Sequence, residues 1–188
     1  MVWSMRGVIT ALGFLLLLSG CGARVPPGVA SATPPVYRLG PGDKIRVNVF
    51  GEETLSREYA ITSAGELSFP LIGEMSAAGK SPAELGAELT KRLGAGYIED
   101  PRVSVEMIGY RPFYILGEVE RSGEFPYVTN LSAMQAVALG GGYTYRADRR
   151  QVFIRRAGEN EERAYRLDEG NPVWIMPGDT IRIGERYF

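Results

Sequence analysis

Two short helix signals, set among runs that alternate apolar and polar residues, leave this chain few ways to fold. The first lies at Ser81–Glu84, which combines an N-cap serine, a proline at the first helical position and a glutamate three residues after the serine. Leu85, Leu89 and Leu93 then recur every fourth residue, and Gly94 offers a C-cap. The spacing predicts an amphipathic helix that lays its leucine face on a sheet.

The second helix signal lies in the C-terminal half of the chain. Ser132, with Gln135 three residues later, predicts a capped helix over residues 133–139. The triplet Gly140–Gly142 directly after it is typical of a helix exit. Each half of the chain therefore has one short helix to cross a small sheet.

Runs that alternate apolar and polar side chains predict the strands. The run from 44 to 49 puts its apolar residues on one face, and the run from 103 to 107 repeats this pattern. Pro112 marks a boundary between two strand-rich segments. We therefore expect an α+β protein of two small domains, residues 37–110 and 111–188, each a mostly β sheet crossed by one helix. The strands expected in the second domain are 113–119, 125–128, 151–155, 163–167 and 180–183.

The segment between the first strand and the first helix is predicted to form a hairpin. Residues 58–61 and 67–69 are strand-like, and Gly65 between them can adopt the positive φ of a tight turn. Pro70 interrupts the second of these strands. Residues 71–75 are expected to continue the same sheet after the proline.

Two distant segments share a short sequence echo. Pro41–Val47 reads PGDKIRV, and Pro177–Ile183 reads PGDTIRI. In each copy the proline fixes φ, the glycine relieves the next position, and the aspartate can bond the following backbone N–H group. We interpret both copies as structural turns that precede a strand.

The first twenty residues have the pattern of an export signal. Arg6 supplies a positive charge, and the apolar stretch Val8–Leu18 follows it. Such a stretch rises only about 16 Å as a helix, against roughly 30 Å for a bilayer core, so we expect it to be removed and not to span the membrane. Leu18–Cys21 resembles the lipobox of bacterial lipoproteins. The lipobox implies cleavage between Gly20 and Cys21 and attachment of diacylglycerol to the sulfur of Cys21.

A lipobox implies a signal peptide over residues 1–20 and a mature chain anchored by two or three acyl chains, which hold far more firmly than one. Gly22 follows the cysteine, at the position where an aspartate tends to retain enterobacterial lipoproteins in the inner membrane. This residue is compatible with transfer to the outer membrane. Residues 21–36 are rich in Gly, Ala and Pro and cannot form a helix or a central strand, so we predict a lipidated, flexible tether.

The composition excludes several classes of function. The chain has no histidine, so it lacks the usual imidazole base and the commonest transition-metal ligand. Lysine and arginine number 21 against 22 acidic residues, which gives no reason to expect nucleic acid as a partner. Cys21 is the only cysteine, so no intramolecular disulfide can form. We predict no catalytic residues, no metal site and no cofactor.

An ordered set of motifs resembles the polysaccharide biosynthesis and export domain of outer-membrane polysaccharide export proteins. The set comprises the first Pro-Gly-Asp turn with its strand, the segment Gly65–Gly73, the leucine helix and the strand in Asp100–Val105. Tyr114–Ile183 is similar to the soluble-ligand-binding β-grasp module that follows this domain in the family, notably at Ile115–Val119. The resemblance implies that the second domain is β-grasp-like.

The resemblance also implies a non-enzymatic, periplasm-facing lipoprotein of the outer membrane. Such proteins form a ring-shaped homo-oligomer around a hydrophilic channel, through which a capsular polysaccharide or exopolysaccharide leaves the periplasm. The implied partners are the polysaccharide and an inner-membrane polysaccharide co-polymerase. The sequence departs from the longest family members in ending at Phe188 with no terminal amphipathic helix. Exposed backbone is costly in lipid, so we expect a separate outer-membrane β-barrel protein to complete the passage.

Some motifs allow an enzymatic interpretation. A pair of carboxylates could act as in a glycosidase, although the acidic residues lie in predicted turns and on polar strand faces. Gly40–Gly42 and Gly140–Gly142 invite comparison with phosphate loops, but neither has the lysine-serine ending of such a loop. The acidic candidates are Glu52, Glu53, Glu66, Glu99, Asp100, Glu118 and Glu120.

A contact surface is the remaining candidate site. Tyr143, Tyr145 and Arg146 follow the second glycine triplet, where they could stack on sugar rings, pack between protomers or cover the core. The alternative to an export subunit is a β-grasp ligand-binding or adaptor lipoprotein of another envelope assembly.

Overall fold

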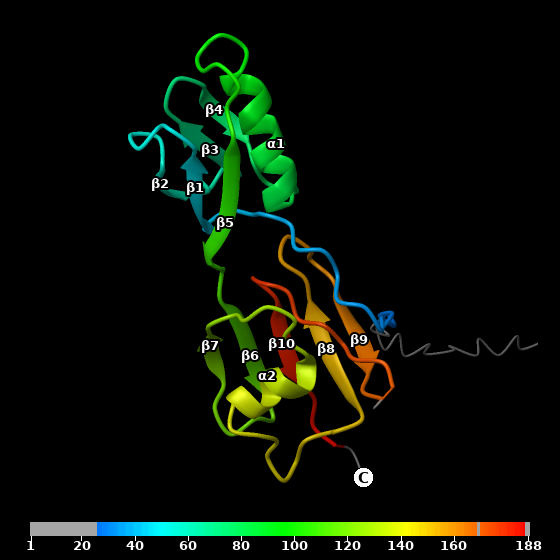
Figure 1. The fold of residues 1–188 in the computed structure, drawn as a ribbon. Coiled ribbons are helices and arrows are strands. Elements are labelled where there is room, and N and C mark those ends of the chain that lie inside the picture. The colour runs from blue at the N-terminus through cyan, green and yellow to red at the C-terminus, as the bar shows by residue number, and fades with distance from the viewer. Residues whose placement is uncertain (1–25, 169, 187–188) are drawn as a thin grey trace, which may run out of the picture.

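The computed structural model describes residues 26–168 and 170–186, which form two units joined end to end (Figure 1). This is the α+β class that the sequence predicts, with sheets crossed by helices. The elements of the first unit are β1 Lys44–Val49, β2 Arg57–Ala60, β3 Glu66–Phe69, β4 Gly73–Ser76, α1 Pro82–Leu93 and β5 Val103–Gly109. Those of the second are β6 Phe113–Gly117, β7 Gly123–Phe125, α2 Ala133–Leu139, β8 Gln151–Arg155, β9 Glu162–Arg166 and β10 Thr180–Ile183.

The first unit is built on an antiparallel sheet in the order β2-β1-β5. Val47 of β1 lies opposite Arg57 on one side and Val105 on the other. The apolar face predicted for residues 44–49 is confirmed, because Ile45, Val47 and Val49 are all buried in the core of this unit. Alternation of period two therefore decides which face of β1 meets the core.

The predicted hairpin of residues 58–61 with 67–69 is wrong. β2 pairs with β1, and β3 pairs instead with β4 in a separate two-stranded sheet, with Leu67 opposite Met75. Pro70 cannot donate to a ladder, and Leu71 adopts a positive φ of 69°, so the chain reverses there and returns as β4, which pairs with β3. The expectation that the sheet continues after the proline is therefore correct for β3 and β4, whereas β2 belongs to another sheet. The turn at Gly65 is real, but it connects two different sheets.

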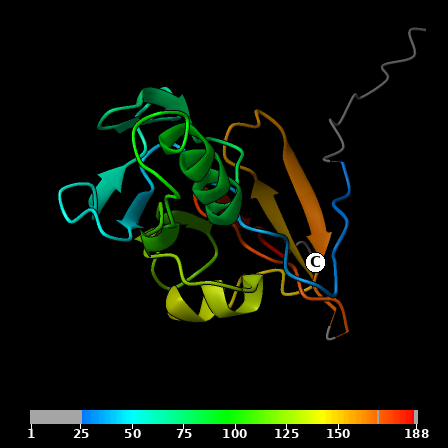
Figure 2. The same cartoon turned by 45° about the horizontal axis from the view of Figure 1, so that its top comes forward.

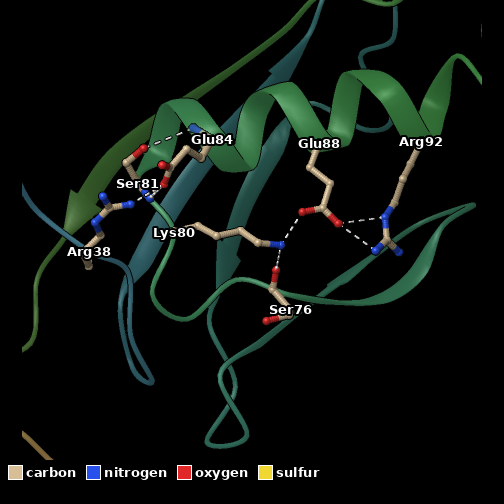
Figure 3. Close-up of polar contacts among 7 residues, drawn as sticks. All are labelled: Arg38, Ser76, Lys80, Ser81, Glu84, Glu88 and Arg92. Atoms are coloured by element: carbon tan, nitrogen blue, oxygen red, sulfur yellow. Dashed lines mark hydrogen bonds and ion pairs between the residues drawn. The ribbon is translucent and has the colours of Figure 1, made fainter.

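Helix α1 has the capping box that its sequence predicts. The side chain of Ser81 accepts a hydrogen bond from the backbone of Glu84, whose carboxylate accepts one from the backbone of Ser81 (Figure 3). Gly94 is the C-cap, and the predicted leucine face is buried. Gly86 brings the helix close to β5, because a Cβ there would already touch the side chain of Val105 at 3.4 Å. The amphipathic helix thus packs on the sheet.

A second polar cluster fastens α1 to the two-stranded sheet. Glu88 accepts hydrogen bonds from Lys80 and, at 2.7 Å, from Nη2 of Arg92, while Lys80 also donates to the backbone oxygen of Ser76 at 2.5 Å (Figure 3). The hydrogen bond from Lys80, with help from Arg92, lowers the pKa of Glu88 below its ordinary value. The sheet end at β4 and the middle of the helix are therefore linked through charge.

The second unit is a five-stranded mixed sheet in the order β7-β6-β10-β8-β9. β6 and β10 are parallel, while the other neighbours are antiparallel. Helix α2 crosses this sheet (Figure 1), with Ser132 and Gln135 forming the predicted capping box and Gly140 as the C-cap. Neither α1 nor α2, the helices of the described residues, is long and apolar enough to cross a membrane.

Residues 26–31, which we call the strap, lie along the outer edge of β9 (Figures 1 and 2). The backbone N–H of Ala164 donates to the oxygen of Pro26 at 2.9 Å, and that of Gly28 donates to the oxygen of Ala164 at 2.7 Å. This differs from the flexible tether expected for residues 21–36. Proline is excluded from central strands but tolerated at a sheet edge, where its missing N–H can face outward.

Candidate functional site

The two copies of the Pro-Gly-Asp motif form the same turn. The glycine has a φ of 90° at Gly42 and 87° at Gly178, which a residue with a side chain rarely adopts. The aspartate carboxylate accepts a hydrogen bond from the backbone N–H three residues earlier, at 2.7 Å in both copies. Asp43 and Asp179 are completely buried. The two copies thus form a shared structural turn, as predicted, but each aspartate binds an amide that precedes it and not the following one that the sequence predicts.

Both oxygens of Asp43 have partners. The Oδ2 atom accepts from the backbone N–H of Gly40 and from the hydroxyl of Tyr37. The Oδ1 atom accepts from Arg111, through Nε at 3.2 Å and through the backbone N–H at 3.3 Å. Burial and the bond to this carboxylate raise the pKa of Tyr37 above its ordinary value. Asp43 is therefore a saturated acceptor in a buried site.

Asp179 is less well satisfied. Its Oδ2 atom accepts from Nη1 of Arg156 at 2.5 Å and from the backbone of Met176, but Oδ1 has no hydrogen-bond partner in the described part of the chain. The backbone N–H of Ala157 lies near enough to favour the charged form, without meeting hydrogen-bond geometry. Burial nevertheless dominates and raises the pKa of Asp179 above its ordinary value.

The two turns meet at the link between the units, where β5 leads into β6 (Figure 1). Asp43 holds Arg111 of this link, and the backbone N–H of Gly178 donates to the oxygen of Pro112 at 2.8 Å. The guanidinium of Arg111 covers Gly40 so closely that a Cβ there would lie 2.6 Å from Nη1. The link is thus clamped by a turn from each unit.

A row of aromatic rings lies beside this clamp. Tyr110, the residue before Arg111, makes edge-to-face contacts with Tyr37 at 5.1 Å and with Tyr127 at 5.3 Å between ring centroids. Such pairs add to the packing energy of the area they bury. The sequence predicts the turns but not their convergence. The signals present were the echo itself and an arginine directly before Pro112 at the expected boundary.

The predicted contact residues Tyr143, Tyr145 and Arg146 have three different environments. Tyr143 is half-buried against the second core, and the guanidinium of Arg149 lies 5.6 Å from its ring centroid. Arg146 forms an ion pair with Glu185, with Nε donating at 2.8 Å. Tyr145 is 84% exposed. Of the three, Tyr145 is thus the side chain that can stack on a ligand.

Tyr145 borders an open depression of about 520 Å³ that is rich in arginine. Arg150 projects outward from it, with 81% of its side chain exposed, while bonding Asp148 at 3.1 Å. Burial opposes the charge of Asp148, but the hydrogen bonds from Arg150 outweigh it and lower the pKa of the carboxyl. The depression can offer guanidinium donors and one aromatic ring to hydroxyl or acidic groups. It is lined by Tyr145, Ala147, Asp148, Arg149, Arg150 and Arg186.

The geometry of the described residues gives little support to a phosphate-binding loop, a metal site or a catalytic carboxylate pair. The backbone N–H groups of Gly140, Gly141 and Gly142 donate to carbonyls of α2, so they form a helix cap and not a phosphate cradle. Among the described residues no three or more Asp, Glu, His or Cys side chains gather to hold a metal. Glu118, a candidate carboxylate, accepts a hydrogen bond from Thr144. The predicted cleavage and lipid site, Gly20 and Cys21, lies outside the described residues.

Comparison of the chain with known proteins identifies its family. Residues 31–108 match the model of the family described as polysaccharide biosynthesis/export protein. The chain is also 37% identical over 163 residues to the exopolysaccharide production protein ExoF of Rhizobium meliloti, an alignment that covers 80% of this chain. Residues 31–108 place the chain in the polysaccharide biosynthesis/export protein family. Within this family segment lie the first Pro-Gly-Asp turn, α1 and most of β5.

Other relatives in the polysaccharide export family are more distant. The EPS I polysaccharide export outer membrane protein EpsA of Ralstonia nicotianae is 25% identical over 197 residues, covering 87% of this chain. The polysialic acid transport protein KpsD of Escherichia coli is 27% identical over 123 residues, covering 64% of this chain. The chain spans only part of each relative: 37% of ExoF, 51% of EpsA and 22% of KpsD.

Proposed function

We propose that this chain is a periplasm-facing lipoprotein subunit of an outer-membrane assembly that exports capsular polysaccharide or exopolysaccharide. The match of residues 31–108 to the export family carries this proposal. Two of the relatives are named for export or transport of a polysaccharide, and EpsA is named as an outer membrane protein. The lipobox-like segment ending at Cys21 supports a lipid anchor.

The geometry of the link suits a subunit of a fixed assembly. A protomer of a closed ring must present its two lateral faces at one constant angle, because each interface repeats around the ring. The ion pair of buried Asp43 with partly buried Arg111 and the bond from Gly178 to Pro112 support such a constant angle between the units. We therefore propose a ring-shaped homo-oligomer, with an inner-membrane co-polymerase and a separate outer-membrane β-barrel as its partners.

The role we propose is passive and not enzymatic. The chain has no histidine, and its buried aspartates serve turns and ion pairs. A conduit needs surface for contact and not a reacting group. Tyr145, exposed beside the arginine-rich depression, is the residue we propose to contact either the polymer or the neighbouring protomer.

The test is secretion of surface polysaccharide by a strain that lacks the gene. We expect polymer to be lost, to return with the wild-type chain, and not to return with Cys21→Ser, which removes the acylated sulfur and little else. Labelling with a palmitate analogue and fractionation would show whether the wild type alone is anchored. Unchanged polymer in the deletion strain would overturn the export role and favour the adaptor alternative.

Oligomeric state gives an independent measurement. The detergent-extracted wild-type protein is expected to have the mass of a closed ring by light scattering. A monomer that nevertheless restored secretion would contradict the ring while leaving the export role intact. Tyr145→Ala, compared with Tyr143→Phe as a control that keeps the core ring, would show whether the exposed ring affects mass, secretion or both.

A further inference from the structure

An exposed aromatic ring lies beside an arginine at one end of the three-stranded sheet. Phe50 directly follows β1 and is 77% exposed. The guanidinium of Arg102, the residue before β5, lies over the Phe50 ring, 5.4 Å from its centroid. The backbone N–H of Phe50 donates to the oxygen of Arg102 at 2.9 Å, so the pairing of the two strands extends to these residues. The ring and the guanidinium are thus held together by the backbone.

Polar side chains continue this face of the sheet along the strands. Asn48 lies opposite Ser104, and its Nδ2 atom donates to the Ser104 hydroxyl at 3.4 Å. The amide oxygen of Asn48 accepts no hydrogen bond within the described part of the chain. Val47 and Val49 point to the other face of β1, where they are buried in the core of the first unit. One face of the sheet is therefore closed by packing, and the other is open and polar.

The exposed ring and the polar row border one open depression of the first unit. Its volume is about 480 Å³, within the range of about 300–1,000 Å³ that is typical of ligand sites. It is lined by an aromatic ring, an amide, hydroxyl groups and one cation, and by no carboxylate. Arg102 forms no ion pair with an acid among the described residues. The depression therefore suits a ligand with an apolar flat side, hydroxyl groups and a negative charge.

We infer that this depression binds an acidic sugar unit, with the sugar ring on Phe50 and its carboxylate on Arg102. The inference rests on the proposed function, because it takes the sugar from the exported polymer, and it adds the chemical class of that polymer. The C–H groups of a sugar ring form an apolar side that can pack on an aromatic face. Its hydroxyl groups can bond the amide of Asn48 and the hydroxyl of Ser104. A guanidinium binds a carboxylate through paired hydrogen bonds.

The charges along the open face give the bound sugar a direction. Farther from the aromatic ring, Arg46 lies opposite Glu106 and forms an ion pair with Glu58 at 2.8 Å. A carboxylate at that end would face Glu58 and Glu106, whereas at the other end it meets Arg102. The cation–π contact already orders Arg102, so this side chain loses less freedom when it binds an acid. The acidic group is therefore expected beside the ring.

A shallow site of this kind suits a conduit. A polymer that passes through must be bound favourably enough to enter and weakly enough to leave. One exposed ring and one guanidinium provide few contacts for each sugar unit. Both side chains lie outside the buried core, so they can be changed without loss of the fold.

Calorimetric titration of the mature chain, purified in detergent, tests the site with a matched pair of probes. A cello-oligosaccharide and its fully oxidised counterpart of equal length, an oligoglucuronate, differ only in the carboxylate on each sugar unit. Hydrogen bonds to charged groups contribute enough free energy that we expect the wild type to bind the acidic oligomer about tenfold more tightly than the neutral one.

Two substitutions should separate the roles of the charge and the ring. Arg102→Gln should remove the preference, weakening the acidic oligomer about tenfold and leaving the neutral one unchanged. Phe50→Ala should weaken both oligomers roughly fivefold, whereas Phe50→Trp should retain both. Arg155→Gln is the matched control, because it removes an exposed guanidinium from β8 that likewise has no acid partner in the described part of the chain. It should change neither affinity.

Three results would overturn the inference. They are equal affinity of the wild type for the two oligomers, no binding of either, and loss of the acidic oligomer in Tyr145→Ala but not in Phe50→Ala. No binding would favour contact of this face with a protein. The secretion test fails separately. Acidic binding that depends on Phe50 and Arg102, together with unchanged polymer in the deletion strain, would reject the export role and keep the sugar site.

Discussion

The two Pro-Gly-Asp turns share a backbone and differ in what their aspartates do. Asp43 and Asp179 accept the same hydrogen bond, at the same length, from the amide three residues earlier. The second oxygen of Asp43 binds Arg111 in the link between the units, whereas that of Asp179 has no partner among the described residues. The same local sequence therefore closes a turn twice, but only the first of the two aspartates binds the link.

The arginine that faces each aspartate explains the difference. Arg156 follows β8 and belongs to the same unit as Asp179, so that pair stabilises a single domain. Arg111 lies between β5 and β6 and can reach Asp43 only when the link has its observed path. A buried acid is costly unless it is paired, so the Asp43 pair makes the folding of the first unit depend on the link.

The largest effect should come from truncating the aspartate that serves the link. Asp43→Ala leaves Arg111, Tyr37 and the Gly40 amide without their acceptor in a buried site. Removing one partner of a buried ion pair typically costs about 3–5 kcal/mol. Urea denaturation of the unlipidated chain, in a Cys21→Ser background, measures this loss as a drop in the free energy of unfolding. A loss under about 1 kcal/mol would show that the clamp contributes little.

Amide substitutions should separate the two turns more sharply. In Asp179→Asn the remaining oxygen can stay on Arg156 and Met176, and the new NH₂ group takes the place of the oxygen that has no partner. In Asp43→Asn the NH₂ group faces a donor in either orientation, which typically costs about 1–3 kcal/mol of folding free energy. Equal losses for the two variants would contradict the contrast between the turns.

The pH dependence of stability should also distinguish Asp179. Burial raises its pKa in the folded protein, so the folded state binds the proton more tightly than the unfolded state does. Its contribution is fully present below the ordinary pKa of 3.8 and is lost as the pH rises through the higher folded value. Asp179→Asn mimics the protonated form. The stability of this variant relative to wild type should therefore increase from pH 3 toward pH 7, in urea titrations at each pH.

The same titrations contain an internal contrast. The pKa of Glu88 is lowered by Lys80, so its contribution is present above the ordinary 4.5 and is lost as the pH falls through the folded value. Wild type and Asp179→Asn share this loss, and it cancels in their difference. A difference that stays flat, or that decreases toward pH 7, would show that Asp179 is not penalised by burial.

Local signals in the sequence predict most of the elements but not how distant elements pair. The capping boxes at Ser81 and Ser132 and the apolar face of β1 depend on neighbours in the chain, and all are as predicted. The pairing of β2 depends on competition among strands, and the reversal at Leu71 depends on a backbone conformation that leucine rarely adopts. The glycine and proline content of residues 21–36 predicts a free tether. This composition carries no information about the unpaired edge that β9 offers to residues 26–31.

The convergence at the link was unpredictable for a similar reason. Asp43 and Arg111 are 68 residues apart, and the place of this arginine directly before Pro112 marks a boundary without showing which acid the arginine meets. What the sequence does supply is the repeat of the turn. A turn with a buried aspartate requires a cation or an amide nearby, and the structure shows that each copy finds one from a different place.

The smallest effects should come from the helix caps, where the two units are most alike. Ser81→Ala and Ser132→Ala each remove one side chain that accepts a backbone N–H, and each should cost about 1 kcal/mol. We expect the loss of unfolding free energy to be larger at α1, because the capping residue Glu84 also binds Arg38 at 2.5 Å. At α2 the capping residue is Gln135, and its hydrogen bonds within the described part of the chain include none from a cation. The free energies of unfolding of the two variants, measured in 1 M NaCl, should converge, since salt screens the exposed pair. Persistence of the difference in salt would assign it to helix length and not to charge.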